Sequence, residues 1–215
     1  MDWIELIKQI SILIGIWVAI YGIDAWRREH IGKRQLELAE DTLALFYEAV
    51  DAIKHIRHPL SYNYETEEVE RGEYEDDEKF QARKRASVVF HRYNQYQELF
   101  NKIYASRYRF MAQIGKAEAA PFDELREIVN EIISSARMLS RLWARANFRT
   151  DEQWKKHEEK TDKHEAVFWE GLEEDDPINP KIKDVILNIE KTCGEIIQGK
   201  GTLHSFLNIK LGKNS

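Results

Sequence analysis

The N-terminal part of the chain carries one long apolar segment. Residues 6–25 are almost entirely apolar, and no charged residue occurs between positions 10 and 23. A helix needs about 20 apolar residues to cross a bilayer core, and Lys8 can extend its ammonium group to the lipid headgroups. Trp3 and Trp26 flank the segment, at positions that suit the two membrane interfaces. The pattern predicts a transmembrane anchor at residues 1–28.

Two other kinds of segment share this apolar character. One is a buried helix of a soluble protein, because the uncharged run is short for a membrane span. The other is a signal peptide, which is disfavoured because Asp2 and Glu5 interrupt the basic region that such a peptide begins with. No small-x-small cleavage site precedes Arg27 either.

Beyond the anchor, apolar residues recur at alternating steps of three and four, the spacing of a helix that buries one face. Gly32 is the only helix-breaking candidate between the anchor and Pro59, so we expect one helix to run from the anchor to Arg57. Its predicted buried stripe comprises Leu36, Ala39, Leu43, Phe46, Val50 and Ile53.

Further helices are expected after an acidic loop at residues 59–78, whose like charges predict a solvated and mobile segment or a docking site for a basic partner. These helices are expected to run from about Glu78 to Ile114, and to begin at Pro121, at Thr150 and after Asn179. The prediction is an all-α fold: the anchor, an antiparallel bundle of about four to five helices in residues 29–198, and a C-terminal tail at 199–215.

Composition supports this reading. Ten glycines and four prolines among 215 residues are too few for a turn-rich β fold. A net charge of −6 argues against a nucleic-acid-binding role, so no nucleic-acid partner is expected. The single cysteine, Cys193, excludes an intrachain disulfide and suits a reducing compartment.

The residues that flank the anchor predict its orientation. A basic cluster follows it and only Lys8 precedes it, so the positive-inside rule places the C-terminal domain in the cytoplasm. Membrane lipid is therefore an expected partner, with headgroup contact from Arg27, Arg28, Lys33 and Arg34.

Within the anchor, Ser11, Gly15 and Ala19 recur every four residues. Small residues at this spacing let two helices approach closely, so this face is a candidate for transmembrane packing in a homo-oligomer. The alternative is a monomeric anchor in which the spacing is incidental.

No catalytic, cofactor-binding or metal-binding residue is predicted. Gly194, Gly199 and Lys200 match part of a phosphate-binding loop, but Gly201 replaces the required Ser or Thr. No histidine follows a glutamate by three positions, which excludes the di-iron bundle motif. The residue types and their spacing thus predict no cofactor and no enzymatic activity.

Two polar patterns remain. His157 and His164 lie one heptad apart on the predicted fourth helix. They are either pH-responsive groups at the edge of the bundle or half-exposed, hydrogen-bonded side chains. A basic stripe on the predicted third helix consists of Arg137, Arg141 and Arg145. It is either an interaction surface or a solvated face that pairs with Glu124, Glu127 and Glu131.

The segments GKRQLELAEDTLALFYEA and FNKIYASRYRFMAQIGKAEAAPFDELREIVNEI resemble those of a group of uncharacterised bacterial single-pass inner-membrane proteins with a cytoplasmic helical domain. The likeness covers most of the chain up to about residue 197. It implies a bacterial inner-membrane location, and it implies no catalytic residue because the group carries no known activity.

Two hypotheses about function follow. The first is a membrane-tethered helical module for interaction or oligomerisation, with a protein partner that the sequence does not identify. The alternative is a membrane-acting stress or defence effector, which only the joining of an anchor to a compact domain supports.

Overall fold

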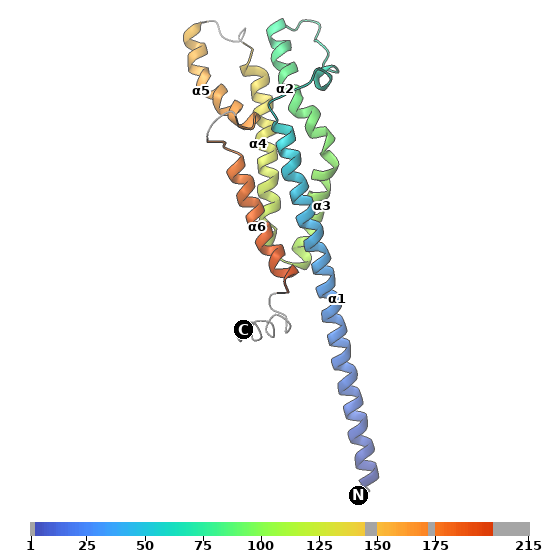
Figure 1. Cartoon of the computed structure of the whole chain (residues 1–215). Coiled ribbons are helices and arrows are strands. Elements are labelled where there is room, and N and C mark those ends of the chain that lie inside the picture. Colours follow the sequence, from blue (N-terminus) through green and yellow to red (C-terminus); the bar gives the residue numbers. More distant parts are fainter. Residues whose placement is uncertain (1–2, 145–149, 172–174, 200–215) are drawn as a thin grey trace. The chain divides into compact units, whose positions relative to one another are not determined.

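The computed structural model describes residues 3–144, 150–171 and 175–199. These residues form helices and connecting loops, and no strand occurs among them, so the predicted all-α helical bundle is confirmed (Figure 1). The elements are α1 (Trp3–Arg57), η1 (Asn63–Thr66), α2 (Asp77–Gln95), α3 (Gln97–Gln113), η2 (Ala117–Ala119), α4 (Ala120–Leu142), α5 (Asp151–Phe168) and α6 (Asn179–Ile197), where η denotes a short 3₁₀ helix.

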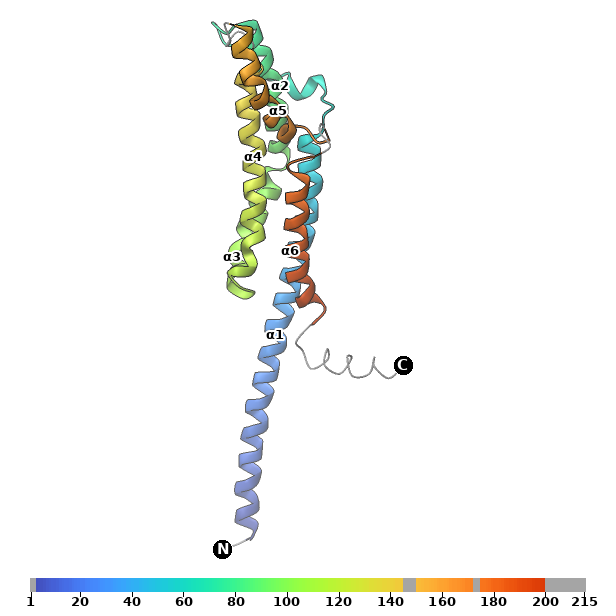
Figure 2. The same ribbon diagram turned by 90° about the vertical axis from the view of Figure 1, so that its left-hand side faces the viewer.

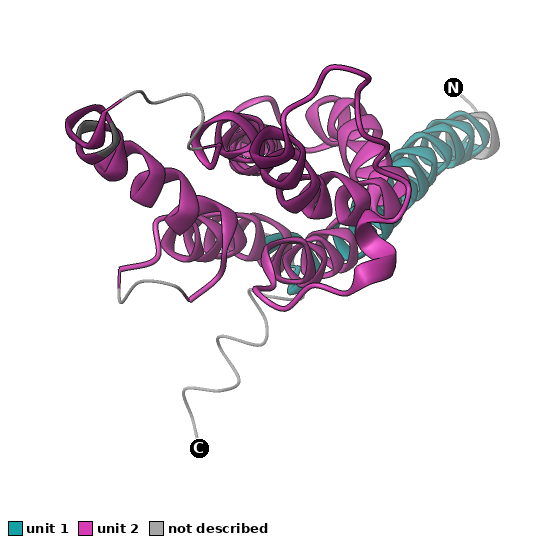
Figure 3. Cartoon of the chain, turned by 90° about the horizontal axis from the view of Figure 1, so that it is seen from above, with its two compact units in different colours: residues 1–41, 195–215 teal, residues 42–194 magenta. Residues whose placement is uncertain are grey.

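The chain divides into two compact units, residues 1–41 with 195–215 and residues 42–194 (Figure 3). Helix α1 passes from the first unit into the second without interruption, as the scarcity of helix breakers before Pro59 predicts. The anchor boundary predicted after residue 28 lies inside α1 and stays a prediction.

In the first unit, α1 exposes large apolar side chains on every side. Leu13 is 66% exposed, Trp17 67% and Ile23 64%, and α1 is the one helix in the described residues that is long and apolar enough to span a membrane. None of its apolar window is buried within the chain.

In the second unit, α4 packs against α2 and α5 (Figures 1 and 2). The face of α4 that packs into the bundle consists of the buried residues Leu125, Val129, Ile132, Ala136 and Leu139. Phe122 also contributes from the first turn of α4, with its ring centroid 5.0 Å from that of Phe46 in α1 and 5.1 Å from that of Phe110 in α3. This aromatic cluster packs α1, α3 and α4 against one another.

The buried stripe of α1 differs partly from the predicted one. Phe46 and Ile53 are buried as expected, but Leu43 and Val50 are only half-buried. The small residues Thr42 and Ala49 take the buried positions instead. Close approach of neighbouring helices favours small side chains at the buried positions. The spacing of large apolar residues alone does not identify these positions.

The helix expected from Glu78 to Ile114 is two helices, so that interpretation was wrong. Tyr96 separates α2 from α3, with φ of −105° and ψ of 8°, and its N–H donates to the Tyr93 carbonyl over 3.0 Å. Neither glycine nor proline marks this break, and the apolar spacing continues across it.

Part of the acidic loop contacts the bundle, whereas most of its carboxylates are exposed, as expected for a solvated segment. Glu65 in η1 is 4% exposed, and its carboxylate accepts hydrogen bonds from Arg92 over 2.6 and 3.1 Å. Further along, Arg83 contacts the Glu75 carboxylate over 2.6 Å. Arginines of α2 therefore hold the acidic loop against the bundle.

A second buried arginine connects α1 to the α5–α6 loop. Arg57 is fully buried, donates to the backbone carbonyls of Ala166, Val167 and Trp169, and pairs with Asp176 over 2.8 Å. Asp176 in turn accepts hydrogen bonds from the N–H groups at the start of α6. This arginine thus stabilises the end of α5 and the start of α6 together.

Candidate functional site

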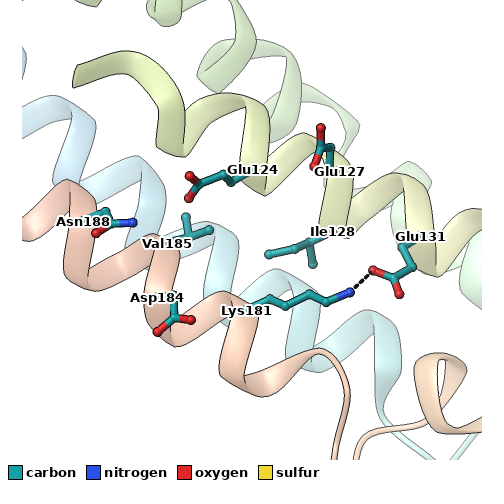
Figure 4. Close-up of a pocket in the computed structure, with 8 residues that line it drawn as sticks. All are labelled: Glu124, Glu127, Ile128, Glu131, Lys181, Asp184, Val185 and Asn188. Carbon is teal, nitrogen blue, oxygen red and sulfur yellow. Dashed lines mark hydrogen bonds and ion pairs between the residues drawn. The ribbon is translucent and has the colours of Figure 1, made fainter. Parts of the chain in front are cut away.

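A groove with mainly acidic walls lies between α4 and α6 of the second unit. It encloses about 410 Å³ and is drawn in Figure 4. Each helix contributes four residues at spacings of three and four, and the lining consists of Glu124, Glu127, Ile128 and Glu131 of α4 with Lys181, Asp184, Val185 and Asn188 of α6.

The floor of the groove is apolar and its walls are acidic. Ile128 and Val185 lie between the two helices and are 3% and 2% exposed. Four carboxylates and one ammonium group line the groove, and Lys181 pairs with Glu131 over 2.5 Å. Within the described part of the chain, Glu124, Glu127 and Asp184 form no ion pair. The walls therefore carry three uncompensated negative charges.

A second groove lies between α1 and α6. It encloses about 520 Å³ and includes Tyr47, whose hydroxyl donates to the Glu190 carboxylate over 2.7 Å. Its charged residues are balanced, with Asp51 and Glu170 against Lys54 and Lys183. Balanced charge gives this groove less selectivity for a partner than the acidic groove has.

The predicted stripe on α4 is only partly described. Arg137 and Arg141 are exposed, and Arg145 lies outside the described residues. The proposed pairing of this stripe with Glu131 is wrong, because Glu131 pairs with Lys181 of α6 instead. Sequence reasoning did not identify Lys181, Asp184 or Asn188 as site residues, since only the packing of α6 opposite α4 brings them to the glutamates.

The two histidines of α5 lie in different surroundings. The ring of His164 is 3.1 Å, Nδ1 to Oγ, from Ser135 of α4, and burial lowers the pKa of His164, as does the nearby Lys163. His157 is half-buried and its backbone carbonyl accepts a hydrogen bond from Thr161. In the described part of the chain, no group of three or more His, Cys, Asp or Glu side chains could hold a metal ion.

The predicted anchor residues all lie at the surface of the first unit. Ser11, Gly15 and Ala19 are exposed, and a Cβ atom added to Gly15 would have no neighbour within 4 Å. The Ser11 hydroxyl donates to the Ile7 carbonyl over 2.8 Å, so this polar group is satisfied within the helix. Arg27, Arg28, Lys33 and Arg34 are likewise exposed.

Comparisons with known proteins add no assignment. No family model, no curated protein and no solved structure matches this chain.

Proposed function

We propose that this protein is a membrane-tethered helical interaction module of the bacterial inner membrane, with residues 1–28 as the anchor and the bundle in the cytoplasm. The observation that carries the proposal is the exposure of apolar side chains all around α1. Leu13, Trp17 and Ile23 are each more than half exposed. Exposure to water of so many large apolar groups costs about 25 cal/mol per Å², and a lipid environment removes that cost.

The charges beside the anchor support the proposed orientation. Arg27 and Arg28 follow the apolar segment directly, and Lys33 and Arg34 lie about two turns further on. Exposed basic side chains next to a membrane span favour the cytoplasmic side and contribute about 1 kcal/mol each near anionic headgroups.

The bundle supports the interaction role. It presents two open grooves on the two flanks of α6. Glu124, Glu127 and Asp184 of the first groove form no ion pair within the described residues, so this groove presents negative charge to a partner.

The test is fractionation of cells that express the full chain or a version lacking residues 1–28. We expect the full chain to pellet with membranes after an alkaline carbonate wash, and the truncated chain to stay in the supernatant. A green fluorescent protein fused to the C-terminus should fluoresce, because it does so only on the cytoplasmic side. Recovery of the full chain in the soluble fraction would refute the proposal.

A further inference from the structure

We propose that the groove between α4 and α6 binds a helical protein segment with a basic surface, such as an amphipathic helix that carries lysine or arginine at every turn. This inference names the partner class of the interaction module and so rests on the proposed function. Its evidence comes entirely from the second unit.

The first argument is charge complementarity. Glu124, Glu127 and Asp184 have no ion-pair partner in the described residues, although Lys181 neutralises Glu131 beside them. A cationic segment would be attracted to these carboxylates and would be guided to the groove by its field.

The second argument is the spacing of the carboxylates. Glu124, Glu127 and Glu131 follow one another at steps of three and four on α4, so they occupy one face over about 10.5 Å. Lysines of a helix at the same steps repeat with the same rise. A helix that lies along the groove therefore meets successive carboxylates with successive basic groups.

The third argument is the shape and floor of the groove. The groove follows the line between two helices, which is the arrangement that the helix-in-groove mode of recognition uses. Ile128 and Val185 close the floor of the groove, and the Asn188 side chain adds an amide at one end (Figure 4). Because the two apolar side chains are buried, the partner would contact mainly the polar groups of the walls.

The test uses the full chain in nanodiscs of zwitterionic phosphatidylcholine. The probe is a fluorescent alanine-based helical peptide with lysines at steps of three and four, and binding is measured by fluorescence anisotropy. We expect the probe to bind more weakly as salt rises. The same peptide with glutamate in place of lysine should not bind.

Three variants locate the binding surface. Glu124→Gln, Glu127→Gln and Asp184→Asn combined should weaken binding about tenfold, which corresponds to three exposed ion pairs. The matched control, Glu67→Gln, Glu68→Gln and Glu73→Gln, removes the same charge from the acidic loop and should leave binding unchanged. Lys181→Gln frees Glu131 and should tighten binding about threefold.

Several outcomes would overturn the inference. They are absence of probe binding, equal weakening by the groove and loop variants, and equal binding of the glutamate peptide. A change in oligomeric state on neutralising the groove, without probe binding, would make a second copy the occupant. Because none of these results moves the protein out of the membrane fraction, they are distinguishable from failure of the tether. Circular dichroism of each variant verifies that the bundle is folded.

Discussion

The guanidinium group of Arg92 and the carboxylate of Glu65 form an ion pair over 2.6 Å in which each side chain is only 2% exposed. Arg92 also donates to the carbonyl of His55 in the last turn of α1, and to the carbonyls of His58 and Leu60 just after that helix. Burial opposes ionisation of Glu65, but hydrogen bonds from Arg92 and the Tyr62 N–H outweigh it and hold the pKa of Glu65 below its ordinary value. This ion pair thus fixes the η1 part of the acidic loop to α1 and α2.

Breaking this pair should strongly destabilise the bundle. Glu65→Gln leaves the buried Arg92 charge uncompensated, so we expect a loss of about 3–5 kcal/mol in the free energy of unfolding. Guanidinium unfolding of the full chain in mild detergent, followed by circular dichroism, measures the loss. Lys181→Gln is the control, because its pair with Glu131 is 49% and 38% exposed and should contribute less than about 1 kcal/mol. Equal effects of the two variants would contradict the assignment.

The carboxylate of Glu75 should titrate at unusually low pH. Hydrogen bonds from Arg83 and from the Gly72 N–H lower the pKa of Glu75 from 4.5 to about 2. The resulting stabilisation is present above pH 4.5 and is lost as the pH falls through the range from 4.5 to about 2. Carboxyl carbon NMR during an acid titration would detect this, and Arg83→Gln should return the pKa toward 4.5. An unshifted Glu75 in the native chain would show that the Arg83 contact does not persist in solution.

His164 should make the bundle less stable in weak acid. Burial disfavours the charged ring, so its pKa in the folded protein lies below the ordinary value of 6.5. Stability is therefore complete above pH 6.5 and declines as the pH falls from there through the lower folded value. Comparison of unfolding free energies at pH 7 and pH 5 measures the decline. His164→Gln, which retains a hydrogen-bonding group toward Ser135, should reduce it, and an identical decline in both proteins would exclude His164 as the cause.

Self-association of the anchor should depend on Gly15. An isoleucine at this position would keep two helices from approaching closely, so Gly15→Ile should reduce dimerisation about tenfold. Energy transfer between labelled copies in liposomes would measure this. Leu13→Phe adds bulk about 200° away around the helix and should have no effect. If Gly15→Ile left the energy transfer unchanged, the anchor face of Ser11, Gly15 and Ala19 would have no role in packing.

Helix positions were largely predictable because they depend on local signals. Pro121 lies in the first turn of α4, and the Thr150 hydroxyl accepts a hydrogen bond from the Gln153 N–H at the start of α5, as the sequence suggests. The break at Tyr96 was not predictable, since the apolar period is similar on both sides of it. Such a break depends on tertiary packing rather than on a residue with a strong conformational preference.

The buried charges were not predictable for a different reason. Arg92 lies 27 positions from Glu65, and Arg57 lies 119 positions from Asp176. Charged residues are ordinarily exposed, so a local pattern gives no reason to bury either arginine. The acidic groove has the same origin: Glu124 and Glu127 are visible as a charged helix face, but the opposing row of Asp184 and Asn188 depends on how α6 packs.

The burial of Cys193 in α6 has a practical consequence for all of these measurements. Its side chain is fully buried, and burial raises the pKa of the Cys193 thiol to about 12, so the folded protein contains almost no thiolate at neutral pH. Maleimide and nitroxide reagents should therefore leave the native chain unmodified. Single cysteines introduced at Asn188 or Ala19 can then carry spectroscopic reporters without removal of the natural residue.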